Sequence, residues 1–251
     1  MISSDKPLLI VKTGCTPAAI SARRGDFEQW ITTGLGLDDR HVLVVDVANN
    51  EPLPLAGLLS GVVITGAPAM VTERSDWMLR AEDFVKELIN HRVPTLGICF
   101  GHQLIAQALG GVVGWHPRGR EIGTTTISLS NAAQNDALFA GSNPTFPVHV
   151  THMQSVLTPP PGAIVLASND FESHHGLRFA EKAWGLQFHP EFDEDIMAGY
   201  LHERRDDIRR EGQDPDRLLA AVAPTPESTG LLRRFSALCG VAFRSATLTD
   251  C

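Results

Sequence analysis

The sequence predicts an α/β protein with a mostly parallel central sheet and helices on both of its faces. In the first half of the chain, short apolar runs alternate with longer amphipathic segments, which is typical of buried parallel strands joined by helices. From about residue 112 the apolar segments are shorter and more closely spaced, which indicates a β-rich extension of the same domain. After Phe192 the chain is polar and has helical spacing.

Four strands and three helices are expected before residue 112. The strands are unbroken apolar runs, and the third helix ends at Gly110-Gly111. The expected strands cover residues 8–11, 41–47, 61–65 and the apolar residues before Cys99, and the expected helices cover residues 17–31, 75–90 and 103–109. Active sites of parallel sheets lie at the carboxyl ends of the strands, and Cys99 stands at such an end.

The second half is expected to form strands first and helices afterwards. The strands cover residues 124–129, 148–151, 163–167, 175–179 and 183–188, and the last two form a hairpin. The helices cover residues 193–210, the stretch from 214 to 222, and a part of 226–239. We expect residues 1–192 to form one domain, with a C-terminal helical extension, residues 193–251, packed on it. Closing over the active site and forming a homodimer surface are the alternatives for this extension.

Charge and composition limit the kinds of binding partner and the cellular compartment that we expect for this protein. The net charge of −8 argues against nucleic acid as the main partner. The N-terminus lacks a signal-peptide pattern and no apolar run approaches membrane-spanning length, so we expect a cytoplasmic protein without a membrane partner. The four cysteines are far apart and none forms a CxxC pair, which indicates neither a disulfide framework nor a cysteine zinc site. Three of them are expected to be bystanders: Cys15, Cys239 and Cys251.

The most informative motif places Cys99 between Gly97 and Gly101, where an apolar run meets an amphipathic one. This is the layout of a nucleophile elbow, in which small residues allow a tight turn from strand to helix. The turn lifts the thiol above the sheet and directs the helix N-terminus at it, and both effects favour a thiolate. The alternative is an inert cysteine packed in the core, because cysteine is among the most buried residue types.

A catalytic thiol needs a base, and the base needs a group that orients it. His189 and Glu191 follow an apolar strand and are two residues apart, so in extended backbone their side chains point to the same side. Glu191 would hold the imidazole while the other ring nitrogen meets Cys99. Taken alone, this His-Pro-Glu segment is more often a loop. Beside a glycine-flanked cysteine it indicates a catalytic triad.

Acyl transfer also needs an oxyanion hole, formed by two backbone N–H groups aimed at the attacked carbonyl oxygen. One N–H is expected from Phe100, directly after the nucleophile. The other would come from residues 65–68, which follow the third strand. Gly66 and Ala67 are small enough to let the backbone approach a substrate closely. An ordinary strand-ending turn would suit the same four residues equally well.

Three segments together identify a family. In this order and spacing, Thr65-Gly66-Ala67-Pro68, the Gly-Ile-Cys-Phe-Gly-His-Gln of residues 97–103 and the Gln-Phe-His-Pro-Glu of residues 187–191 resemble class I glutamine amidotransferases. The resemblance is greatest to the glutaminase domain of GMP synthetase and its free-standing relatives, including the γ-glutamyl peptidases. It covers roughly residues 7–192 and implies a flavodoxin-like class I glutamine amidotransferase fold.

The resemblance implies a role for each matching residue. Cys99 would be the nucleophile, His189 the general base and then acid, and Glu191 the orienting carboxylate, with no metal and no cofactor. The N–H groups of Ala67 and Phe100 would form the oxyanion hole. Contacts to the substrate would come from Gly66, Gln103, Thr151, Met153 and Gln154.

Three positions depart from the family's pattern. Ala67 replaces the second glycine of a Gly-Gly-Pro block, which matters little if only its N–H is used. Met153 and Gln154 replace the glycine and aspartate of a Ser-His-Gly-Asp segment, so they bear on substrate selection and not on the chemistry. Residues 120–123 also match a family segment, for which a structural role is expected.

The predicted reaction is hydrolysis of a γ-glutamyl amide bond through a thioester, with release of ammonia or an amine. In one alternative the substrate is glutamine and the released ammonia is delivered to a synthase. In the other the substrate is a γ-glutamyl peptide or conjugate, and no synthase takes part. Only about sixty residues follow Glu191 and they contain no glycine-rich nucleotide loop, so a synthase partner would be a separate protein chain. A non-catalytic regulatory subunit is a third hypothesis, against which the intact triad argues.

Overall fold

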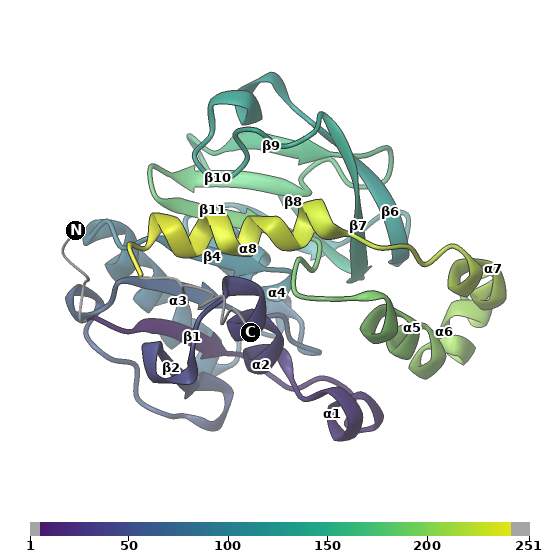
Figure 1. The fold of residues 1–251 in the computed structure, drawn as a ribbon, viewed down its shortest axis with the longest axis horizontal. Coiled ribbons are helices and arrows are strands. Elements are labelled where there is room, and N and C mark those ends of the chain that lie inside the picture. The colour runs from purple at the N-terminus through teal and green to yellow at the C-terminus, as the bar shows by residue number, and fades with distance from the viewer. Residues whose placement is uncertain (1–5, 242–251) are drawn as a thin grey trace, which may run out of the picture.

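The centre of the fold is a parallel sheet (Figure 1). The computed structural model describes residues 6–241, so the predictions for the N-terminal residues 1–5 and for Cys251 lie outside it. In spatial order the parallel strands are β2 (Val42–Asp46), β1 (Leu8–Lys12), β3 (Gly61–Ile64), β4 (Thr95–Ile98) and β11 (Ala183–Leu186). Four of them are the strands expected from the apolar runs of the first half.

Antiparallel strands extend this sheet beyond β11. In spatial order they are β10 (Gly176–Ala180), β9 (Ile164–Ser168), β6 (Glu121–Leu129) and β7 (Thr145–His152). β10 and β11 form the expected hairpin, and β11 also pairs in parallel with β4. The hairpin therefore joins the β-rich half to the parallel half in one continuous sheet, and the predicted α/β fold class is confirmed.

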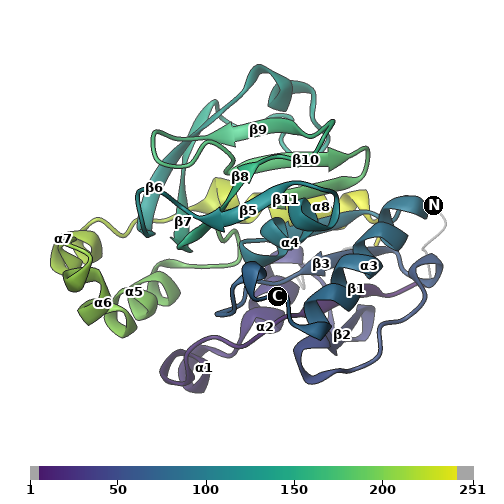
Figure 2. The same ribbon diagram turned by 180° about the vertical axis from the view of Figure 1, so that it is seen from behind.

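Helices cover both faces of the parallel strands (Figures 1 and 2). α2 (Phe27–Leu35) and α8 (Pro226–Leu238) pack together on one face. α3 (Asp76–Asn90) and α4 (Phe100–Ala108) pack together on the other. The helix α8 thus brings the end of the described chain back onto the first half of the sheet.

Alternate residues of β1 enter two different cores, as the period of two of a strand requires. Leu8 and Ile10 belong to the core that contains α2 and α8. Leu9 and Val11 belong to the core that contains α3 and α4. All four side chains are at most 1% exposed. This two-sided burial explains why the strand is apolar at every position and does not alternate with polar residues.

The prediction of a single helix over residues 17–31 is wrong. The structure has α1 (Ala18–Arg24) and α2, which are separated at Gly25 and Asp26. Gly25 ends α1 with φ 79°, a value that glycine adopts without steric cost. Asp26 then caps α2, because its side chain accepts from the N–H of Phe27 at 2.9 Å.

The helix expected over residues 193–210 is also interrupted. α5 (Glu194–Glu203) and α6 (Arg205–Arg210) meet at Arg204, where φ is −98° and ψ is 9°. Neither glycine nor proline marks this position, so the sequence carries no local sign of the break. α7 (Pro215–Ala220) follows, and α5, α6 and α7 lie together at the carboxyl ends of the parallel strands (Figure 1).

A small second sheet was not expected. It consists of β5 (Val112–Trp115) and β8 (Gln154–Thr158), which pair antiparallel and lie in front of the larger sheet in Figure 2. β8 begins two residues after β7 ends, so the chain turns sharply at Met153. Among residues 6–241, no helix has the length and apolar character to cross a bilayer. The division of the chain at residue 192 stays a prediction.

Candidate active site

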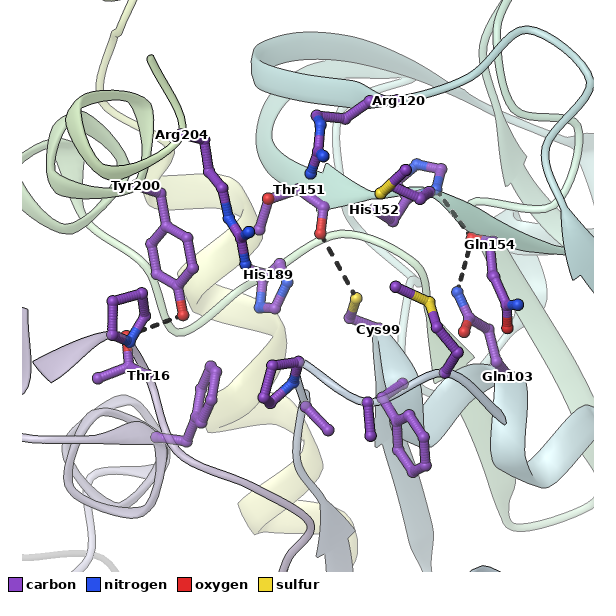
Figure 3. Close-up of a pocket in the computed structure, with 18 of the residues that line it drawn as sticks. Thr16, Cys99, Gln103, Arg120, Thr151, His152, Gln154, His189, Tyr200 and Arg204 are labelled. Atoms are coloured by element: carbon purple, nitrogen blue, oxygen red, sulfur yellow. Dashed lines mark hydrogen bonds between the residues drawn. The ribbon is translucent and has the colours of Figure 1, made fainter. Parts of the chain in front are cut away.

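Cys99 occupies a sharp turn between β4 and α4. Its φ of 50° and ψ of −99° are uncommon for a residue other than glycine and store strain in the turn. The N–H of Cys99 donates to the carbonyl oxygen of Leu186 in β11 at 2.7 Å, and its own carbonyl accepts from the N–H of Gln103 at 3.1 Å. The backbone is therefore fixed on both sides, and the thiol faces a cavity of about 340 Å³ (Figure 3).

Gly97 and Gly101, two residues on either side of Cys99, leave no room for a side chain, because other backbone atoms approach them closely. A Cβ on Gly97 would lie 2.4 Å from the carbonyl carbon and oxygen of Gly101. A Cβ on Gly101 would lie 2.4 Å from the carbonyl oxygen of Ile64. The first turn of α4 thus rests directly on β3 and β4, and Cys99 itself takes the positive φ of the turn.

His189 and Glu191 form a buried pair next to Cys99. Nδ1 of His189 lies 2.7 Å from Oε1 of Glu191, and their side chains are 3% and 0% exposed. The imidazole stacks on the ring of Phe192, with the ring centroids 4.1 Å apart. Because Nδ1 is taken by Glu191, Nε2 is the nitrogen left to face the thiol in the cavity that both Cys99 and His189 line.

The charges in this pair favour an imidazolium. Burial alone would lower the pKa of His189, but the negative charges of Glu191 and Cys99 outweigh it and raise this pKa from 6.5 to about 10. At neutral pH His189 therefore carries a proton that it can give to a leaving group.

The two residues expected to supply the N–H groups of an oxyanion hole, Ala67 and Phe100, both line the cavity with Cys99. Phe100 is the first residue of α4, and the first N–H groups of a helix have no partner within it. Ala67 lines the cavity together with Phe100. Gly66 lies against the imidazole of His189, since a Cβ added there would be 3.0 Å from Cε1 of His189.

Of the residues expected to contact the substrate, Gln103 and Gln154 lie on the other side of Cys99 from His189 (Figure 3). Gln103 donates from Nε2 to the carbonyl oxygen of Gln154 at 2.7 Å. The side chain of Gln154 donates to the hydroxyl of Thr72 at 2.6 Å, and its Oε1 is buried without a partner among the described residues. Thr151 and Met153 line the cavity, and the thiol lies 3.9 Å from the carbonyl oxygen of Thr151.

Gln187 is a site residue that the sequence reasoning missed. Its Nε2 lies 3.6 Å from Sγ of Cys99, and its Oε1 accepts from Gln103 at 3.0 Å. The side chain is fully buried. The sequence contains a sign of this position: Gln187 precedes His189 by two residues, just as His189 precedes Glu191, so in extended backbone all three side chains point to the same side.

A buried network behind the cavity supports the segment around Gln154. Glu121 lies 2.9 Å from Nε2 of His152 and accepts from Asn169 at 2.7 Å. Burial opposes the charge on Glu121, but the hydrogen bonds of His152 and His175 lower the pKa of this carboxyl. Nδ1 of His152 lies 3.1 Å from the carbonyl oxygen of Gln154. Within residues 6–241, no cluster of histidine, cysteine or acidic side chains is arranged to hold a metal ion.

The far wall of the cavity comes from segments for which the sequence predicted no site. Thr16 donates from its hydroxyl to the hydroxyl of Tyr200 at 2.8 Å. Arg120 and Arg204 line the same cavity, and Arg120 also makes a two-point ion pair with Glu211 at 2.8 and 3.0 Å. No local pattern in the sequence could have brought these residues together.

Known proteins resemble this chain in sequence and in fold. A family model described as glutamine amidotransferase class-I matches residues 26–202. One chain of the glutamine-hydrolyzing GMP synthase of Sulfolobus acidocaldarius is 38% identical over 131 residues, which cover 52% of this chain and 66% of that protein. Gamma-glutamyl peptidase 5 of Arabidopsis thaliana is 29% identical over 139 residues, which cover 55% of each protein. The match thus spans about two thirds of the first relative and about half of the second.

The fold itself is shared over almost the whole chain. The crystal structure of a glutamine amidotransferase from Thermotoga maritima has a TM-score of 0.74 at 22% sequence identity, covering 94% of this chain and 99% of that one. The family model extends from the residue that caps α2 into α5 and includes all three segments that carry the resemblance. The protein therefore belongs to the class I glutamine amidotransferases.

Proposed function

We propose that this protein hydrolyses a γ-glutamyl amide bond and that Cys99, His189 and Glu191 carry out the reaction. The observation that carries the proposal is a thiol on a strained turn, in one cavity with a buried imidazole whose Nδ1 is 2.7 Å from a carboxylate. Family membership supports the same reaction class, since the relatives include a glutamine-hydrolyzing enzyme and a γ-glutamyl peptidase.

The first half of the reaction forms a thioester. The thiolate of Cys99 attacks the γ-carbonyl carbon, and the carbonyl electron pair moves to the oxygen, where the N–H groups of Ala67 and Phe100 stabilise it. When the carbonyl re-forms, the carbon–nitrogen bond breaks. The proton on Nε2 of His189 goes to the departing nitrogen, so ammonia or a neutral amine leaves.

The second half of the reaction hydrolyses the thioester. Neutral His189 takes a proton from water, and the resulting hydroxide attacks the γ-carbonyl carbon. The carbon–sulfur bond breaks, glutamate leaves, and the thiolate and imidazolium are restored. Glu191 keeps the imidazole oriented throughout, because its carboxylate binds Nδ1 in both halves.

The glutamyl half of the substrate is assigned to the side of Cys99 where Gln103 lies. Met153 and Gln154 complete this proposed subsite, and Gly66 and Thr151 are proposed as further contacts to the substrate next to His189. Polar backbone and amide groups suit the α-amino and α-carboxylate groups of a glutamyl unit. Oxygen Oε1 of Gln154, buried and without a partner among the described residues, is suited to accept from the α-amino group.

The test is turnover of γ-glutamyl amides by the purified protein and by Cys99→Ala. Ammonia release from glutamine and glutamate release from γ-glutamyl dipeptides are measured, and both should be abolished in the variant. Cys239→Ala is the matched control, because Cys239 follows α8 and packs against Gly61, away from the cavity. Turnover by Cys99→Ala equal to that of the unmodified protein would eliminate the proposal.

Partners and compartment stay proposals. The Sulfolobus relative is one subunit of a GMP synthase, which supports a separate synthase chain as partner of this protein if ammonia is its product. A homodimer formed through the C-terminal helices and a cytoplasmic location are likewise proposed. Light scattering on the purified protein measures the oligomeric state directly, and a monomer at all concentrations would exclude the homodimer.

A further inference from the structure

The cavity continues past the proposed triad on the side away from Gln103. In Figure 3, His189 lies between Cys99 and Tyr200, whereas Gln103 lies on the opposite side of Cys99. The continuation, here called the distal arm, is lined by Cys15, Thr16, Pro17, Phe27, Tyr200 and Arg204. His189 must reach the departing nitrogen to protonate it, so the leaving amine points into the distal arm.

The charged side chains that line the cavity are basic. Apart from histidine, they are Arg120 and Arg204, and none of the described lining residues is Asp or Glu. This contrasts with the net charge of −8 of the whole chain. A basic cavity in an acidic protein favours an anionic ligand, because a cleft lined by one sign of charge concentrates the opposite sign.

Of the two arginines, Arg204 is the one whose guanidinium is less neutralised by other side chains and so more able to bind an anion. The guanidinium of Arg120 is compensated by its two-point ion pair with Glu211, and its side chain is 7% exposed. Arg204 approaches Asp207 at 3.5 Å, and no hydrogen bond of its guanidinium is found within residues 6–241. Its side chain is 37% exposed, and Figure 3 shows the guanidinium directed toward His189. The donors of Arg204 can therefore bind a ligand.

The fold fixes Arg204 over the distal arm. Arg204 directly follows α5, and its N–H donates to the carbonyl oxygen of Tyr200, one turn earlier, at 3.0 Å. Tyr200 is buried and its hydroxyl accepts from Thr16 at 2.8 Å, which ties α5 to the segment that follows β1. The interruption between α5 and α6 falls at Arg204 itself.

We propose that Arg204 binds a carboxylate on the leaving amine, so that the preferred substrate is a γ-glutamyl amino acid or peptide. This deepens the proposed function and rests on it. Guanidinium and carboxylate form strong, directional hydrogen bonds, for which arginine is better suited than lysine. Ammonia, the leaving group of glutamine, carries no anionic group that could use Arg204. After the carbon–nitrogen bond breaks, the nitrogen takes the proton of His189 and the amino acid leaves.

The experiment compares two substrates that differ only in one charge, γ-glutamylglycine and γ-glutamylglycinamide. The ratio of their kcat/KM values measures recognition of the leaving-group carboxylate and cancels effects on the glutamyl half. We expect the unmodified protein to prefer γ-glutamylglycine. Arg204→Gln should lower this ratio by about tenfold to a hundredfold, the range for a hydrogen bond to a charged group. Arg204→Lys should retain part of the preference.

Arg205→Gln is the matched control. Arg205 is the neighbouring arginine, but it pairs with Asp216 at 2.5 Å and is not among the residues that line the cavity. Its substitution should leave the ratio unchanged. Thermal unfolding of each variant establishes that it is folded before kinetics are compared.

The outcomes separate this proposal from the proposed function. If the protein hydrolyses glutamine but shows no preference for γ-glutamylglycine, the function stands and the role of Arg204 is wrong. The role is also wrong if Arg204→Gln slows both substrates equally, because the residue would then serve the glutamyl half or the fold. If the protein hydrolyses no γ-glutamyl amide, glutamine included, both proposals are wrong.

Discussion

Replacing Gly97 by alanine tests whether the turn at Cys99 depends on close packing. The added Cβ would lie 2.4 Å from the carbonyl carbon of Gly101 and 2.7 Å from the N–H nitrogen of His102. Carbon atoms in contact are normally about 3.5 Å apart, so α4 would have to move by about 1 Å. It cannot retreat easily, because these are backbone atoms and Gly101 already rests on Ile64.

The expected cost follows from this displacement. Overpacking of a well-packed site costs about 1–3 kcal/mol, and we expect the upper end because no side-chain rotation relieves the contact. A movement of about 1 Å at the start of α4 would also misplace Cys99 and the N–H of Phe100, which predicts a loss of about a hundredfold in kcat/KM. Stability is measured by urea unfolding, and activity by turnover of a γ-glutamyl amide.

Gly230→Ala is the control for this prediction. Gly230 lies inside α8, and apart from its chain neighbours and the backbone of α8, no described atom lies within 4 Å of the position that its Cβ would take. Since alanine favours a helix, this variant should be as stable as the unmodified protein or more stable by up to about 1 kcal/mol. Unfolding of Gly97→Ala within about 0.5 kcal/mol of the unmodified protein, with full activity, would refute the packing argument.

Three further predictions concern buried polar groups. Because the pKa of His189 is raised from 6.5 to about 10, its protonated form stabilises the fold fully below pH 6.5, and this stabilisation is lost as the pH rises toward 10. The unfolding free energy of His189→Asn should therefore differ most from that of the unmodified protein near pH 6 and least near pH 10, and a constant or growing difference would contradict this. Gln187→Met removes the amide 3.6 Å from Sγ of Cys99 and should slow both turnover and labelling of Cys99 by iodoacetamide severalfold at pH 7, measured by mass spectrometry of the labelled peptide. Asp136→Leu leaves the indole N–H of Trp184, now 3.0 Å from the Asp136 carboxylate, without an acceptor, and should lower the urea unfolding free energy by about 1–3 kcal/mol. An unchanged value would mean that this indole finds another partner.

Much of the fold could be predicted because its information is local. The parallel strands are buried on both faces, so each is an unbroken apolar run that can be recognised without knowing its neighbours. The relation between His189 and Glu191 is also local, since two residues of extended chain suffice to bring them together. The same rule, applied to Gln187 two residues before His189, predicts that its side chain also points to this side of the strand.

Helix interruptions were less predictable, for two different reasons. At Gly25 the sequence holds a signal, because glycine followed by a capping aspartate is a common way to end one helix and begin the next. At Arg204 there is no such signal, since arginine is a good helix former. α5, α6 and α7 pack on one another, so the break there depends on the tertiary fold.

The sequence by itself therefore determined the α/β class, the tight turn at Cys99 and the contact between His189 and Glu191, because each depends on residues close together in the chain. Only the tertiary structure decided which residues from distant parts of the chain lie next to them. Pairing of β11 with β4 places His189 next to Cys99, although ninety residues separate them in the sequence. The folding of α5 over the carboxyl ends of the strands brings Arg204 to the distal arm. Such contacts depend on the packing of segments that are far apart in the chain, and no local pattern encodes them.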